Sequence, residues 1–100
     1  MMESKGAAIP FAARVRIAEG VFFRELVGEA VILSSSAETY FGLDEVGMRI
    51  WGALGESPTI QAAFETLCLE YDVDQDQLRR DLEKFLGELV ARKLIEIHAS

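Results

Sequence analysis

The sequence predicts a small α+β domain of winged-helix-like shape, in which a three-stranded antiparallel meander is followed by three helices. Three observations predict it. Between residues 21 and 43, three short runs rich in β-branched and aromatic residues are separated by turn-forming residues. After Leu43 the apolar spacing changes from two residues to about 3.6, and amphipathic helical segments follow. The chain has 100 residues, which is enough for one domain.

The expected strands are the β-rich runs at residues 21–27, 29–34 and 39–43. Gly28 separates the first pair, and the serine-rich stretch 34–38 separates the second. Links this short join antiparallel strands through hairpin turns. In such a meander the central strand is paired on both sides, whereas each outer strand keeps one free edge.

Three helices are expected after the strands. Helical spacing begins after Asp44, a typical N-cap residue, and stops at Gly55. A second helix follows the Ser-Pro pair at 57–58, and a third, the longest, spans residues 75–92. Trp51 lies on the apolar face of the first helix, so we expect it to anchor the core.

The N-terminal part of the chain, residues 1–20, has no strong apolar period and is interrupted by Pro10. We therefore expect a flexible lead-in there. The folded domain is expected over residues 21–97, ending in a short extended segment at 94–97. No internal repeat or low-complexity tract divides it further.

Charge and composition exclude several classes of protein. The chain carries 17 acidic residues against 10 lysines and arginines, a net charge of −7. This balance argues against binding to nucleic acid or to an anionic membrane surface, because both depend on basic side chains. No run approaches the ~20 apolar residues of a membrane span, and no signal peptide is evident. The single cysteine, Cys68, suits a reducing cytoplasm.

Candidates for catalysis or metal binding are few. His98, the only histidine, lies near the C-terminus and cannot form a ligand cluster alone. Cys68 falls on the apolar stripe of the second helix, as a small buried hydrophobe would. The acidic residues at 72, 74 and 76 resemble the start of a calcium loop, but Gln77 stands where that loop needs glycine. We therefore expect a protein that is not an enzyme, with no catalytic residues, metal site or cofactor.

The last expected strand, residues 39–43, has no proline, lysine or other charge to protect its edge. Such an edge either aggregates or binds an extended peptide. Alternation places Phe41 and Leu43 on one face and Tyr40 on the other. If the third helix packs nearby, a groove forms between the strand and an apolar helix wall of Leu82, Leu86 and Val90. The alternatives are that the lead-in or a second copy of the chain covers this edge.

The region of the third helix is unusually basic for this chain. It holds five of the ten lysines and arginines, namely Arg79, Arg80, Lys84, Arg92 and Lys93. A peptide with some acidic residues could dock beside it. The simpler interpretation is a solvated helix face whose charges are relieved by neighbouring acidic residues.

Three stretches of the chain carry a familiar pattern. The first is Ala30-Val31-Ile32-Leu33 followed by residues 40–51, Tyr-Phe-Gly-Leu-Asp-Glu-Val-Gly-Met-Arg-Ile-Trp, the second is the pair Tyr71-Asp72, and the third is the run Asp81-Leu82, Phe85-Leu86, Leu89 and Leu94-Ile95. In this order and spacing they resemble the PqqD-like family, also called RiPP recognition elements. The resemblance implies a protein that binds the leader segment of a ribosomally made precursor peptide as a strand added to residues 39–43. Carried over by position, the strand edge is Thr39, Tyr40, Phe41, Gly42 and Leu43, and the helix wall is Arg79, Leu82, Glu83, Leu86 and Val90.

Within that family, the sequence of residues 42–51 looks most like that of the standalone recognition proteins of lasso-peptide biosynthesis. The resemblance then implies a leader peptidase, or another processing enzyme, as partner. Lys93 departs from the family, which often has glycine there, and it lies just after the expected end of the third helix. The alternatives are PqqD proper, which presents its peptide to a radical-SAM enzyme, and a winged-helix DNA-binding regulator. We expect a monomer or weak homodimer.

Overall fold

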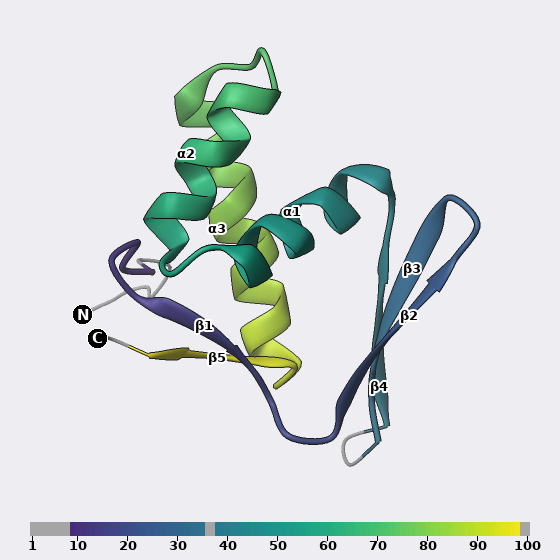
Figure 1. The fold of residues 1–100 in the computed structure, drawn as a ribbon. Helices are drawn as coiled ribbons and strands as arrows, with labels where there is room; N and C mark the ends of the chain where they lie inside the picture. Colours follow the sequence, from purple (N-terminus) through teal and green to yellow (C-terminus); the bar gives the residue numbers. More distant parts are fainter. Residues whose placement is uncertain (1–8, 36–37, 99–100) are drawn as a thin grey trace.

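The computed structural model describes residues 9–35 and 38–98, and Figure 1 shows their arrangement. Within these residues the elements, in chain order, are β1 (Arg14–Ile17), β2 (Val21–Leu26), β3 (Glu29–Ser34), β4 (Thr39–Leu43), α1 (Glu45–Glu56), α2 (Ile60–Glu70), α3 (Gln75–Ala91) and β5 (Ile95–His98). Strands β2, β3 and β4 form an antiparallel sheet in that order, and the helices follow. The predicted α+β fold class is confirmed.

The β2–β3–β4 sheet has one covered face and one open face. On the covered face the fully buried Ile32 of β3 pairs with Phe23 of β2 and Phe41 of β4. Helix α1 packs against β3 and β4 on this side, and the helices all lie to one side of the sheet in Figure 1. The β2–β3 turn is tight because Gly28 adopts a φ of +78°, which favours glycine.

Polar side chains cap the first two helices. The Asp44 carboxylate accepts a hydrogen bond from the Gly47 N–H at 2.7 Å, as expected for the N-cap of α1. In α2 the cap is Thr59, whose hydroxyl accepts from the Ala62 N–H at 3.1 Å. Helix α2 therefore begins later than the Ser-Pro pair at 57–58.

Arg49 of α1 donates a hydrogen bond to the Glu70 carboxylate of α2 at 2.6 Å, and this pairing lowers the pKa of the Glu70 carboxyl.

The expected flexible lead-in is wrong for the part of it that the structure describes. Strand β1 pairs with β5 at the other end of the chain, with Val15 opposite Ile97. Phe11 and Ala13 are buried in the core, and their carbonyls accept hydrogen bonds from the start of α2. Residues 11–17 thus belong to the domain, which does not begin at residue 21. Residues 1–8 lie outside the described part of the chain.

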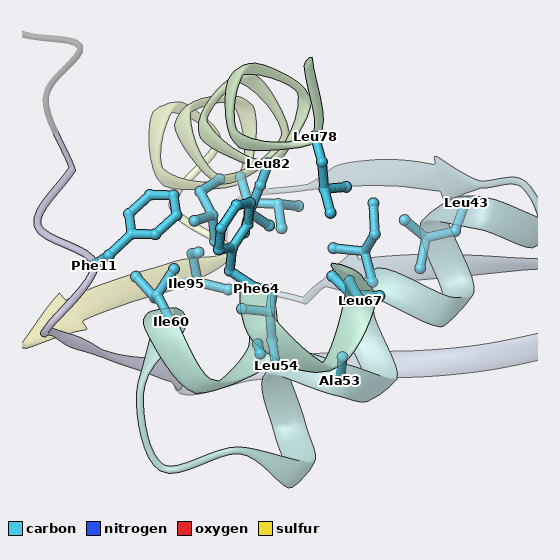
Figure 2. Close-up of a cluster of buried hydrophobic side chains, with 14 of the residues drawn as sticks. Phe11, Leu43, Ala53, Leu54, Ile60, Phe64, Leu67, Leu78, Leu82 and Ile95 are labelled. Carbon is cyan, nitrogen blue, oxygen red and sulfur yellow. The ribbon is translucent and has the colours of Figure 1, made fainter. Parts of the chain in front are cut away.

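The core lies between the helices, the sheet and the β1–β5 ribbon. Figure 2 shows Leu78 and Leu82 of α3 pointing towards Phe64 and Leu67 of α2. Four leucines at helical spacing form the buried stripe of α3, and they are Leu78, Leu82, Leu86 and Leu89. This periodic stripe is the reason that α3 packs along the centre of the molecule.

The sequence predicts Trp51 as an anchor of the core. In the structure Trp51 lies at the margin of the core. It is partly buried, and its indole stacks nearly parallel to the Phe23 ring, with centroids 6.2 Å apart and planes 7° apart. We expect Trp51→Ala to lower the free energy of unfolding by about 2–3 kcal/mol, below the usual cost of truncating a fully buried aromatic residue. Urea denaturation followed by far-UV circular dichroism measures it. A loss under about 0.5 kcal/mol would contradict the packing role.

Candidate functional site

The outer edge of β4 is the first feature of the candidate site. Within the described chain, β3 is the strand that pairs with β4, and β4 lies at the border of the sheet. The direction of its backbone groups follows from the ladder beside it. The Ser35 N–H donates to the Gly20 carbonyl at 3.0 Å, and this bond continues the β2–β3 register. Because hydrogen-bonded pairs alternate in an antiparallel ladder, Leu33 and Val31 also direct their backbone groups to β2.

The intervening residues of β3 therefore direct their backbone groups to β4. These are Ile32 and Ala30, and their partners are Phe41 and Leu43. It follows that Tyr40 and Gly42 direct their N–H and C=O groups away from the sheet, at the outer edge of β4. An extended peptide laid beside β4 could bond to these groups.

Aromatic and basic side chains of α3 lie next to this edge. The Phe41 ring meets the Phe85 ring edge-on, with centroids 5.9 Å apart and planes 76° apart. The Arg92 guanidinium lies over the Phe41 ring, 5.0 Å from its centroid. Phe85 and Arg92 are seven residues apart, so they share one face of the helix end. We call Phe41, Phe85 and Arg92 the aromatic cleft.

A shallow pocket of about 490 Å³ lies along β4 beside the aromatic cleft. Its lining residues are Glu38, Thr39, Tyr40, Phe41, Gly42 and Arg92. A Cβ added at Gly42 would meet no atom within 4 Å, so the sheet face opposite the helices is open at that residue. The strand residues predicted for the site are therefore assembled as expected at one edge.

The helix residues predicted for the site do not line the pocket beside the outer edge of β4. Leu82 and Leu86 are both 0% exposed and belong to the core, so neither can line an open groove. They occupy the centre of the apolar stripe, the part of an amphipathic helix that is covered first.

Arg79, Glu83 and Val90 lie on another flank of α3. The Arg79 guanidinium lies over the Phe11 ring, 4.2 Å from its centroid. Glu83 and Val90 line a different pocket, of about 780 Å³, together with Ile9. The predicted helix wall is therefore corrected: the ring contacts to Phe41 of β4 come from Phe85 of α3 and from Arg92, the residue that follows the helix.

The comparisons with known proteins identify the family. A family model described as "Coenzyme PQQ synthesis protein D (PqqD)" matches residues 29–95, from the start of β3 to the start of β5. The chain belongs to the PqqD family. The resemblance inferred from the sequence is thereby confirmed.

This PqqD-family protein is also similar to a solved structure, "TbiB1 in Complex with the TbiA(beta) Leader Peptide". The two sequences are 38% identical, the match covers 81% of this chain and 94% of TbiB1, and the TM-score is 0.74. A search of curated protein sequences finds no match.

The features that would indicate a metal ion or a membrane span in this PqqD-family protein are not found in the part of the chain that the structure describes. Across residues 9–35 and 38–98, no group of three or more His, Cys, Asp or Glu side chains is arranged to hold a metal ion. In the same residues, no helix is both long and apolar enough to cross a membrane. His98 is exposed and contacts Glu96 at 3.0 Å, and Cys68 packs partly buried against the core.

Proposed function

We propose that this PqqD-family protein binds the leader region of a ribosomally synthesised precursor peptide, which adds as a strand to β4. The observation that carries the proposal is the β4 edge, where Tyr40 and Gly42 direct their backbone groups outward. Its likeness to TbiB1, which was solved in complex with the TbiA(beta) leader peptide, supports the same conclusion. The protein acts as a cytoplasmic monomer or weak homodimer that holds the peptide without catalysis.

Affinity and selectivity have different sources in this mode of binding. Backbone hydrogen bonds to β4 provide affinity for any extended segment, whereas side-chain pockets select the sequence. Side chains on one face of the added strand would point into the aromatic cleft. An apolar or aromatic leader residue would pack against Phe41 and Phe85. A leader carboxylate would pair with Arg92, whose guanidinium is exposed.

The proposal includes the next step, in which the bound leader is presented to a leader peptidase of lasso-peptide type. The domain supports an adaptor, because its described residues form one small core and a strand edge suited to a peptide. The resemblance of residues 42–51 to the standalone recognition proteins of lasso-peptide biosynthesis favours this role over presentation to a radical-SAM enzyme. The net charge of −7 remains an argument against the DNA-binding regulator.

A pair of substitutions at Gly42 tests the strand-addition site. Gly42→Pro removes an outward N–H and places a ring where the added strand would lie, and proline is tolerated at strand edges that face solvent. We expect leader affinity to fall more than tenfold, about 1.4 kcal/mol or more. The measurement is fluorescence anisotropy with a labelled TbiA(beta) leader peptide, the peptide of the TbiB1 complex.

Gly42→Ala is the matched control. Its methyl group enters open space and leaves the N–H in place, so we expect affinity within about twofold of the parent protein. Circular dichroism establishes that both variants fold. If Gly42→Pro folds and binds the leader as tightly as Gly42→Ala does, the leader does not add to this edge.

A further inference from the structure

Strand β2 forms the border of the sheet opposite to β4, among the residues that the structure describes. The β2 residues bonded to β3 are the partners of Leu33 and Val31. Phe23 lies between these two partners and Glu25 follows them. Phe23 and Glu25 therefore direct their backbone N–H and C=O groups away from the sheet, where a further strand could bond to them.

A pocket of about 570 Å³ lies between this edge of β2 and helix α1. Phe23 and Glu25 line it together with Glu45, Met48 and Trp51 of α1. Phe23 is 44% exposed, and its ring stacks on the Trp51 indole. Because Phe23 offers its backbone at the edge and its ring in the pocket, edge and pocket form one surface. We call this surface the β2 edge site.

Two carboxylates without a basic partner give the β2 edge site its charge. Glu25 and Glu45 are exposed, and among the described residues neither forms a salt bridge or a side-chain hydrogen bond. Arg49, the one basic residue that lines this pocket in the described chain, is already paired with Glu70 of α2. The site is therefore complementary to a cationic ligand that also has an apolar group.

We propose that the β2 edge site binds an extended segment of a partner protein in which a lysine or arginine stands two residues before an aromatic or aliphatic residue. The spacing follows from the pleat of an antiparallel strand added about 4.8 Å from β2. Its side chains on the helix side would lie opposite Phe23 and Glu25. Since the added strand runs in the reverse direction, the residue opposite Glu25 comes before the residue opposite Phe23.

Each part of the segment has a partner in the β2 edge site. The basic side chain would pair with the carboxylates of Glu25 and Glu45. The apolar side chain would pack on the exposed Phe23 ring beside Trp51. The site does not depend on β4, so a partner could be held at one border of the sheet while a peptide lies at the other.

A second copy of the chain is a poorer occupant of this edge. Antiparallel pairing of two β2 strands around Phe23 would place Val21 opposite Glu25 and leave the carboxylates without a cation. Each copy also carries a net charge of −7, so the two would repel each other. A simpler role for Glu25 is to prevent aggregation through the edge, as charged residues do on other edge strands. That role requires no preference for a basic ligand.

The test uses the acetylated and amidated peptide Ser-Thr-Lys-Thr-Phe-Thr-Ser as its probe, titrated into the full chain. Trp51 is the only tryptophan of the chain and lines the site, so its emission reports binding there. We expect a saturable change in emission, and at least tenfold weaker binding when glutamate replaces the lysine of the peptide. Methylation of the phenylalanine N–H, which would face β2, should also weaken binding at least tenfold. Methylation of the threonine N–H between lysine and phenylalanine, which would face solvent, should change it within about twofold.

A charge reversal in the protein provides the matched experiment. Glu25→Lys should weaken binding of the lysine peptide at least tenfold and strengthen binding of the glutamate peptide at least tenfold. Glu29→Lys makes the same change of charge on the opposite face of the sheet, and should change either affinity within about twofold. Circular dichroism establishes that both variants fold. The proposal is overturned if Trp51 shows no saturable response, if the parent binds both peptides equally, or if Glu25→Lys keeps the parent's preference.

The probe contains no leader sequence, so failure of the proposed function would leave this test unchanged. A saturating amount of the TbiA(beta) leader peptide should not displace the probe. Displacement would mean that both peptides share one site and would overturn the assignment of a separate partner. A parent dimer in sedimentation velocity that Glu25→Lys dissociates would assign the edge to a second copy, with the same consequence.

Discussion

Replacing Leu86 by aspartate is expected to unfold the protein at room temperature. Leu86 is 0% exposed and belongs to the buried stripe of α3. Removing its packing costs about 2–5 kcal/mol, and leaving a carboxylate buried without a partner costs about 3–5 kcal/mol more. Because domains of this kind are stable by only about 5–15 kcal/mol, little or no folded protein should remain. Far-UV circular dichroism and thermal melting measure it.

The adjacent residue provides a control for Leu86→Asp. Gly87 is exposed, and a Cβ added there meets no atom within 4 Å. Gly87→Asp should therefore keep its unfolding free energy within about 1 kcal/mol of the parent, since aspartate has a somewhat better helix propensity than glycine. A folded Leu86→Asp variant with a melting temperature near that of the parent would contradict the buried position of Leu86. A loss of peptide binding in Leu86→Asp would report unfolding and would say nothing of the groove.

Truncating Phe11 to alanine is expected to lower the free energy of unfolding by about 3–4 kcal/mol. The Phe11 ring is 8% exposed and meets the Phe64 ring edge-on, with centroids 5.7 Å apart. It also lies beneath the Arg79 guanidinium, so its loss would remove a cation–π contact as well as apolar burial. Urea denaturation at neutral pH gives the difference.

Ala12→Ser serves as the comparison for Phe11→Ala. Ala12 is exposed between the buried Phe11 and Ala13, and its substitution should change stability by less than about 0.5 kcal/mol. If Phe11→Ala unfolds at the same urea concentration as the parent, the segment before β1 does not contribute to the core. That result would support the flexible lead-in expected from the sequence.

The β2–β3–β4 sheet and the helices were predictable because their signals are local. Alternating apolar residues with Gly28 at a turn specify the β2–β3 hairpin, and the 3.6-residue period after Asp44 specifies the helices. The same reasoning placed β4 at the border of the sheet, as it is among the described residues, because a meander has two outer strands and residues 39–43 carry nothing to protect an edge. The strand half of the candidate site follows from these facts alone.

The helix half of the site required the tertiary structure. The sequence supplies the apolar stripe of α3 but not the rotation of that helix against the sheet. Phe85 is the one aromatic residue of α3, and its size is the signal that could have pointed to the β4 side. The structure turns Phe85 and Arg92 towards Phe41, and the stripe residues Leu82 and Leu86 into the core.

The sequence by itself determined the order of elements from β2 to α3, the outer strand and the acidic character of the chain. Each depends on residues that are close in the chain, or on composition. The tertiary structure alone decided that β1 pairs with β5, that Phe11 completes the core, and which flank of α3 faces β4. These contacts join residues far apart in sequence. Short segments such as residues 14–17 acquire their structure from a distant partner strand, and their own pattern does not reveal it.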